Sequence, residues 1–349
     1  MRIGYSFWGF LGSGVTDTPD GGRSHRLPLI RALIERGHEM VFLQSDRDRL
    51  EAGDPVARPY RFDDGYPELD ALVVEWRWRI EGRNTTPCNA PGHTCDLHRQ
   101  TSLLRRYTGA LRTPTVIWDK DRRLRPDDGW RASPGVVVCE AALHPTPGAH
   151  RVLFPVEDAL LDSADPRALA RTPRDLPLVY AGNQYDRDNA FDRFFAPVAA
   201  RVDHRVLGKW TNTARWPHIR FVGRQPFPDV ARFHHRSLAT VLLLPDRYAA
   251  AGQMTQRLFE AVLAGCLPLA PATIRDVHRF VPAELVVRDG DHATAVLEGL
   301  LRQVGSAHHV GLLRTCLDRL ALFRLSEQVE RLELAITAAI GSAQSGAPC

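Results

Sequence analysis

Residues 252–270 read GQMTQRLFEAVLAGCLPLA, and this stretch decides the fold. Its apolar residues recur at helical spacing and fill one face: Met254, Leu258, Val262 and Leu263. The apolar run that follows the helix, CLPLA, is typical of a buried strand. Two features are unusual, because Glu260 stands near the middle of the helix and the segment begins at Gly252 instead of at a polar cap.

The same alternation of strand and helix extends along the whole chain. In the first half, five apolar runs predict strands: RIGYSFW (2–8), HEMVFLQ (38–44), LDALVVEW (69–76), TPTVIWD (113–119) and GVVVCEA (135–141). In the second half the corresponding runs are LVYAGN (178–183), HRVLG (204–208), HIRFVG (218–223), ATVLLLP (239–245) and CLPLAP (266–271). Because most of these runs are separated by helical patterns and are apolar throughout, we expect parallel sheets covered on both faces.

These elements predict an α/β protein with two Rossmann-like domains facing a cleft, followed by C-terminal helices. The predicted domains are 1–160 and 176–305, the helices occupy 306–341, and 342–349 is a flexible tail. A segment rich in Pro, Asp and Arg, from about 158 to 177, is the predicted linker between the domains. A chain of 349 residues that is 44% hydrophobic is long enough for two cores.

The composition narrows the class of protein. We find no apolar run long enough to span a membrane, and six scattered cysteines without a framework spacing suit a reduced, cytoplasmic protein. The net charge of +4 is small for a dedicated nucleic-acid binder. Arginine is the usual cation in this chain, so its two lysines, Lys120 and Lys209, are the more interesting as functional residues. The oligomeric state is left open.

The position of the 252–270 segment predicts what it binds. A helix that follows a parallel strand starts at the carboxyl edge of the sheet, and its first backbone amides attract phosphate. A glycine at 252 keeps a side chain from holding the phosphate away from these amides. The carboxylate of Glu260 can only accept hydrogen bonds, so its natural partner is a vicinal diol such as a ribose.

At this point the sequence resembles the nucleotide-sugar glycosyltransferases with the two-Rossmann-domain GT-B fold. The resemblance is closest to glycosyltransferase family 4 and to the spore-maturation-type glycosyltransferases. It rests on GGRSHRLPLIRALIERGHEMVFL (21–43), VYAGNQYDRD (179–188), HIRFVGRQPFPDVARFHH (218–235) and LLLPDRYAAAGQMTQRLFEAVLAGCLPLAP (242–271), which follow the family's order and spacing. It implies transfer of a sugar from a UDP or GDP sugar to a hydroxyl acceptor.

The resemblance also implies roles for individual residues. Family 4 carries two glutamates in the last segment, of which the second contacts the donor ribose and corresponds to Glu260. The first contacts the donor sugar, and its position here is Gly252, so neither the sugar nor the stereochemical outcome carries over. The diphosphate is expected at the start of the helix and beside cations of the second domain. The expected donor-binding residues are Asn183, Arg187, Lys209, Gly252, Gln253, Thr255, Arg257 and Glu260.

The expected chemistry needs no metal, because cations and helix-end amides stabilise a leaving nucleoside diphosphate. The acceptor base is the least defined element. The candidates lie at strand ends or in the first loop and helix: Asp20, His25, Glu75 and Asp119. The expected acceptor is a small metabolite or natural product, with a hydroxymethylated base of phage DNA as the alternative. Basic segments such as DKDRRLRP (119–126) are where a DNA backbone would bind.

Three other hypotheses start from the same sequence. A nucleotide-sugar epimerase would use the same scaffold without an acceptor. GFLGSG (9–14) resembles a dinucleotide fingerprint, but its glycines have the wrong spacing and no acidic residue ends the second strand, which argues against a nicotinamide enzyme. Cys88, His93, Cys95 and His98 are the residue types that hold zinc. Their spacing lacks a two-residue cysteine knuckle and the segment is polar, so we expect no metal, but an ordinary loop and a zinc site both stay open.

Overall fold

The computed structural model describes residues 1–12, 23–53 and 60–345. Contacts divide the chain into two compact units. The first contains Met1–Gly12, Arg26–Leu153 and the described residues from Ser326 onward, and the second contains 23–25 and Phe154–Leu325. Within the described ranges, no helix is long and apolar enough to cross a membrane.

The first unit is a seven-stranded parallel sheet in the order β3-β2-β1-β4-β5-β6-β7. Its strands are β1 (Arg2–Ser6), β2 (Glu39–Phe42), β3 (Arg61–Phe62), β4 (Ala71–Glu75), β5 (Thr115–Asp119), β6 (Val136–Glu140) and β7 (His150–Arg151). Every residue of β4, β5 and β6 is buried, as expected for strands covered on both faces. The order reverses between β1 and β4, which places a topological switch point at their carboxyl ends.

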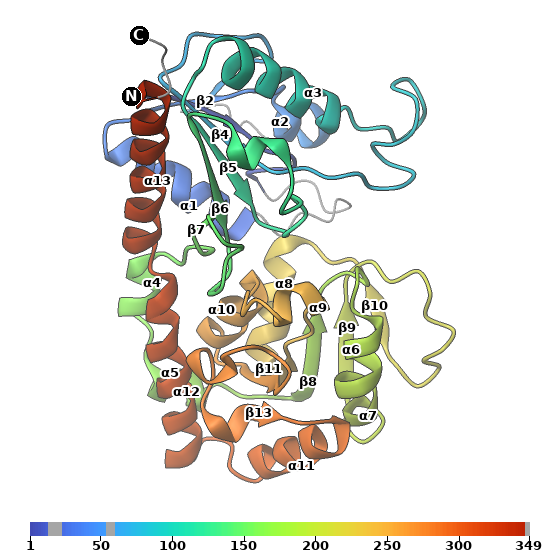
Figure 1. Cartoon of the computed structure of the whole chain (residues 1–349). Helices are drawn as coiled ribbons and strands as arrows, with labels where there is room; N and C mark the ends of the chain where they lie inside the picture. Colours follow the sequence, from blue (N-terminus) through green and yellow to red (C-terminus); the bar gives the residue numbers. More distant parts are fainter. Residues whose placement is uncertain (13–22, 54–59, 346–349) are drawn as a thin grey trace. The chain divides into compact units, whose positions relative to one another are not determined.

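Helices cover both faces of this sheet (Figure 1), with α1 on one side and α3 on the other. The helical segments are α1 (Arg23–Glu35), α2 (Arg47–Ala52), α3 (Asp96–Leu103), the π-helical η1 (Leu104–Ala110), the 3-10 turn η2 (Gly129–Ala132) and, from the end of the chain, α13 (Leu325–Ser345). The side chain of Gln328 in α13 accepts a hydrogen bond from the backbone of Leu153 at 2.8 Å. The last helix therefore packs on the first unit, although the sequence placed residues 306–341 in one separate helical segment.

The second unit is built around a six-stranded parallel sheet in the order β10-β9-β8-β11-β12-β13. Its strands are β8 (Leu176–Ala181), β9 (His204–Leu207), β10 (Phe221–Gly223), β11 (Ser237–Val241), β12 (Leu267–Pro271) and β13 (Val286–Val287). Here the order reverses between β8 and β11. The fold class expected from the sequence, two Rossmann-like α/β domains with additional C-terminal helices, is confirmed.

Helices of the second unit connect these strands and extend past the last of them. Between the strands lie α6 (Asp188–Ala190), η3 (Phe191–Phe195), α7 (Ala196–Ala199), α8 (Phe227–Arg236), α9 (Asp246–Ala249) and α10 (Gln256–Leu263). The 3-10 turns η4 (Val277–Arg279) and η5 (Ala283–Leu285) precede α11 (Gly290–Leu301), α12 (Ala307–Arg319) and η6 (Leu320–Phe323). The predicted linker is partly helical, because 158–177 contains α4 (Asp158–Asp162) and α5 (Pro166–Arg171). Asp165 caps α5 by accepting from the backbone of Arg167 at 2.8 Å.

Candidate functional site

Arg187 lies at the switch point of the second sheet. Its Nε donates to the carbonyl of Leu243, just after β11, at 3.1 Å. Its Nη1 donates to the carbonyls of Asn183 and Tyr185, just after β8, at 3.2 and 2.7 Å. Ligands of open α/β sheets bind outside the carboxyl ends of the strands at such a reversal of strand order. The structure therefore fixes this predicted cation beside the ends of β8 and β11, at the edge where a ligand is expected.

Lys209 lies on the next loop along the same edge, after β9. It is exposed, and its backbone amide donates to Oδ1 of Asn183 at 2.7 Å. The preceding residue, Gly208, has a φ of +117°, and a Cβ there would lie 2.2 Å from the carbonyl oxygen of Gly182. Only glycine allows the loops after β8 and β9 to approach this closely. The predicted residues Asn183, Arg187 and Lys209 are thus brought to one edge of the sheet.

The start of α10 differs in detail from the prediction. The sequence suggested a helix from Gly252, but α10 begins at Gln256, and Thr255 precedes it in an extended conformation without a side-chain capping bond. Gly252 instead forms part of the loop, with a φ of +60° in the left-handed region that glycine favours. The glutamate found here in family 4 would be strained in this conformation. Gln253 is completely buried, which argues against a direct contact with a ligand.

Glu260 lies one turn into α10 and is mostly buried. Its side chain is 17% exposed and forms an ion pair with Arg257, whose Nη1 donates to Oε2. Among the residues that the structure describes, the other carboxylate oxygen, Oε1, is buried without a hydrogen-bond partner. Buried polar atoms are nearly always paired, so this oxygen has the capacity to accept a hydrogen bond from a ligand or a water molecule.

His234 in α8 is a neighbour of this pair that the sequence did not single out. Helix α8 packs against α10, and burial lowers the pKa of His234 to about 4, opposed by the negative charge of Glu260. Neither of its ring nitrogens has a hydrogen-bond partner within the described part of the chain. A neutral imidazole therefore lies buried near Glu260. The sequence signal was weak, because a histidine at the end of an amphipathic helix is usually exposed.

The first unit has its own charged cluster at the switch point between β1 and β4. Glu75, at the end of β4, accepts from the hydroxyl of Tyr5 at 2.8 Å, from Nε and Nη2 of Arg26 at 2.9 and 2.8 Å, and from Lys120. All of these side chains except that of Lys120 are fully or almost fully buried, and Lys120 is 7% exposed. Because Glu75 pairs with two cations, Arg26 and Lys120, its carboxylate is already engaged, which argues against its predicted role as a catalytic base.

Asp119, at the end of β5, is fully buried. Its two oxygens accept from the backbone amides of Arg123 and Leu124 at 3.0 and 2.7 Å. Burial raises its pKa to about 6 in spite of these hydrogen bonds. A carboxyl group that titrates near neutral pH suits proton transfer, although both oxygens already shape the turn after the strand.

The remaining two predicted base residues come from the first loop and helix. Asp20 lies outside the described residues. His25 is fully buried, and its Nδ1 lies 2.6 Å from Nε2 of Gln256, which contacts assign to the same unit. The role of either residue as the base stays a prediction.

No protein-family model and no curated protein matches the chain. Solved structures do match over nearly its whole length. The T4 phage β-glucosyltransferase bound to UDP-glucose is 16% identical, covers 96% of this chain and 99% of its own, and has a TM-score of 0.65. AviGT4, a glycosyltransferase involved in avilamycin A biosynthesis, is 13% identical at a TM-score of 0.59, with 97% and 98% of the two chains covered.

An α-glucosyltransferase in complex with UDP-glucose and DNA containing an abasic site is 10% identical, with a TM-score of 0.62 over 97% of this chain and 99% of that one. At such identities the similarity defines the fold and not the activity. The class of fold is therefore the GT-B fold of nucleotide-sugar glycosyltransferases, as the sequence resemblance implied.

Proposed function

We propose that this protein is a glycosyltransferase that moves a sugar from a UDP or GDP sugar to a hydroxyl acceptor without a metal. The observation that carries the proposal is the orphaned, buried Oε1 of Glu260. A carboxylate in this position accepts hydrogen bonds from the two ribose hydroxyls of a nucleotide. The GT-B fold, and neighbours solved with UDP-glucose, support the choice of ligand.

In the proposed reaction the acceptor oxygen attacks the anomeric carbon, and the bond from that carbon to the diphosphate breaks. Negative charge then develops on the leaving diphosphate. Arg187 and Lys209, together with the amides at the start of α10, are the groups that stabilise this charge. The acceptor hydroxyl loses its proton as its oxygen attacks, and this proton passes to a base or to solvent.

The proposed acceptor is a small hydroxylated molecule. Two of the three arginines in the basic 119–126 segment form ion pairs within the first unit, because Arg122 pairs with Glu140 and Arg125 pairs with Asp127. A DNA acceptor is the second candidate. It is favoured by the similarity to a DNA-modifying β-glucosyltransferase and by the exposed Arg105 and Arg106 after α3.

Calorimetry with UDP, GDP, ADP and NAD tests the class of ligand. We expect binding of UDP or GDP, and binding of NAD but of no nucleoside diphosphate would end the proposal. Incubation with the donor alone separates the transferase from an epimerase, which would convert the donor sugar without an acceptor.

Filter binding to duplex DNA at two salt concentrations tests the acceptor. A small-molecule enzyme binds DNA weakly at either concentration. Micromolar binding with a steep salt dependence would favour the DNA acceptor. Since Arg122 and Arg125 are paired, the decisive variant is Arg105→Ala/Arg106→Ala, with Arg122→Ala/Arg123→Ala/Arg125→Ala as the comparison. Loss of DNA binding in the first variant would locate the contact on η1.

A further inference from the structure

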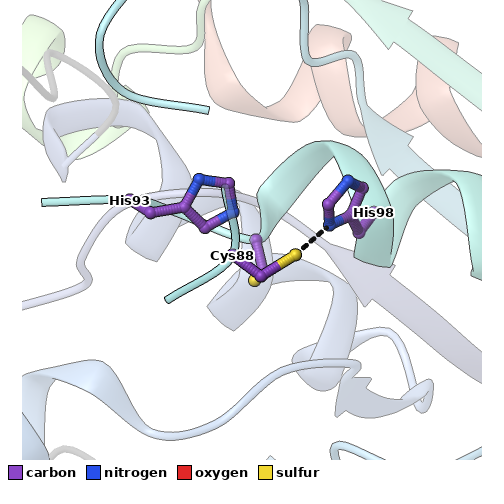
Figure 2. A group of neighbouring side chains, drawn as sticks. Cys88, His93 and His98 are labelled. Carbon is purple, nitrogen blue, oxygen red and sulfur yellow. Dashed lines mark hydrogen bonds between the residues drawn. The ribbon is translucent and has the colours of Figure 1, made fainter. Parts of the chain in front are cut away.

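Four metal-binding side chains converge in the first unit between β4 and α3. Cys88, His93, Cys95 and His98 each offer one ligand atom, and all of these atoms lie within 4.8 Å of one another. Figure 2 shows the side chains of Cys88, His93 and His98 pointing toward one another. The sulfur of Cys88 lies 3.3 Å from Nδ1 of His98. The donor atoms thus surround one small volume, despite the irregular spacing of these residues in the sequence.

The distances suit a zinc ion. Zinc binds sulfur at about 2.3 Å and imidazole nitrogen at about 2.0–2.1 Å, so the ligand atoms of a tetrahedral site are separated by roughly 3.3–3.8 Å. The present separations of at most 4.8 Å therefore need a contraction of about 1.5 Å or less. Two thiolates also cancel the charge of the dication, and a soft sulfur and nitrogen set favours zinc over magnesium or calcium.

The orientation of His93 is already fixed for metal binding. Its Nδ1 lies 3.1 Å from the hydroxyl of Thr86, which engages one ring nitrogen. Its other nitrogen, Nε2, is buried and has no hydrogen-bond partner among the residues that the structure describes. A histidine ligand of a metal typically donates from its second nitrogen to a neighbouring group, which sets the tautomer. The hydroxyl of Thr86 is the neighbouring group for Nδ1 of His93.

The backbone around the cluster is fixed as well. Gly92 adopts a φ of +75° between Cys88 and His93, and the amide of Thr94 donates to the carbonyl of Arg83 at 2.9 Å. Cys95 is the N-cap residue of α3 without a side-chain capping bond, and His98 lies in the first turn of the same helix.

We propose that Cys88, His93, Cys95 and His98 form a structural zinc site that ties the loop after β4 to the start of α3. All four coordination positions are filled by the protein, as in structural and not catalytic zinc sites. The site belongs to the first unit, whereas the residues proposed for the diphosphate belong to the second. Zinc here is therefore consistent with sugar transfer that needs no metal at the donor.

The first test is the metal content of the full chain, purified under reducing conditions and dialysed against metal-free buffer. We expect one zinc ion per chain by elemental analysis. Cobalt added to the metal-free protein should give the thiolate-to-cobalt charge-transfer band and the visible bands of a tetrahedral site. Less than a tenth of an equivalent of zinc together with no cobalt spectrum would overturn the proposal, as would a mass that shows a Cys88–Cys95 disulfide in reduced preparations.

Variants assign the metal to these residues. Cys88→Ser/Cys95→Ser should lose the zinc, and the matched control His308→Ala, an exposed histidine on α12, should retain it. Retention of zinc by the double-cysteine variant would contradict the proposal. Thr86→Val keeps all four ligands and should weaken zinc binding about 10- to 100-fold, because it removes the group that orients His93. If the cysteine variant does not fold, the cobalt titration of the wild-type chain still decides.

Thiol reactivity gives an independent readout. Cys139, Cys266 and Cys316 are buried, whereas Cys88 and Cys95 are exposed. In a Cys349→Ser background, a thiol reagent should therefore react with two cysteines in the metal-free native protein and with none in the zinc-loaded protein. Equal reactivity with and without zinc would contradict coordination by the thiolates.

Discussion

Replacement of Glu260 by alanine is the sharpest test of the proposed nucleotide site. The variant removes the buried carboxylate whose Oε1 has no partner in the described structure. Helix α10 should still form, because alanine has a higher helix propensity than glutamate. A hydrogen bond to a charged group contributes about 1–3 kcal/mol. We therefore expect the Kd for UDP to rise about 5- to 150-fold.

The assay is isothermal titration of the wild type and the variant with UDP and with 2′-deoxy-UDP. If Glu260 binds the ribose, the deoxy ligand should bind the wild type more weakly, but it should lose little when Glu260 is already absent. The coupling between the two changes isolates the contact from general effects on the site. Glu298→Ala, an exposed glutamate on α11 of the same unit, is the matched control and should leave both affinities unchanged.

One outcome refutes the reasoning. If UDP and 2′-deoxy-UDP lose affinity equally in the Glu260→Ala variant, the carboxylate does not contact the ribose 2′-hydroxyl. Thermal unfolding of the variant is measured alongside, because Arg257 loses its ion-pair partner and a fall in stability alone would lower the fraction of folded protein.

Three further predictions follow from the same structure. Lys209→Ala should weaken the binding of UDP by about 1 kcal/mol, or about fivefold, and leave the affinity for uridine unchanged. The reason is that this exposed cation is proposed to contact only the diphosphate. Equal losses of affinity for UDP and uridine in calorimetry would argue against that role. Sugar transfer should proceed at full rate in EDTA without added Mg²⁺ or Mn²⁺, and the zinc content is determined in the same sample. If the rate is lost in EDTA and restored only by Mg²⁺ or Mn²⁺, the reaction is not metal-free. The pKa of His234 is about 4 in the folded chain and about 6.5 in the unfolded chain. As the pH falls, the unfolded state therefore binds the proton first. The free energy of unfolding should decrease between pH 6.5 and pH 4, by at most about 3 kcal/mol. Urea unfolding at several pH values should show a smaller fall for His234→Phe, and an unchanged slope would mean that another group causes it.

The sequence by itself predicted most of the strands and helices, and it singled out Glu260 as the residue proposed to bind the ribose. Strands and helices were predictable because burial imposes a local periodicity, which fully buried runs such as Thr115–Asp119 and the amphipathic 256–263 segment display directly. Glu260 stood out because a carboxylate interrupts an otherwise regular pattern. Very short edge strands such as β7 and β13, two residues each, were missed because they carry too few residues to show any period.

Only the tertiary structure decided which side chains meet. Arg187 is fixed by carbonyls that follow two different strands, and His234 lies near Glu260 because α8 packs on α10. Glu75 was a plausible base in the sequence, yet Arg26 and Lys120, distant along the chain, hold its charge. Spacing argued against a metal site at residues 88–98, but the loop and the first turn of α3 bring the four ligand atoms together. Such contacts join residues that are distant in the sequence, so a local pattern does not encode them. The order of the strands in the sheets decides which of these residues become neighbours.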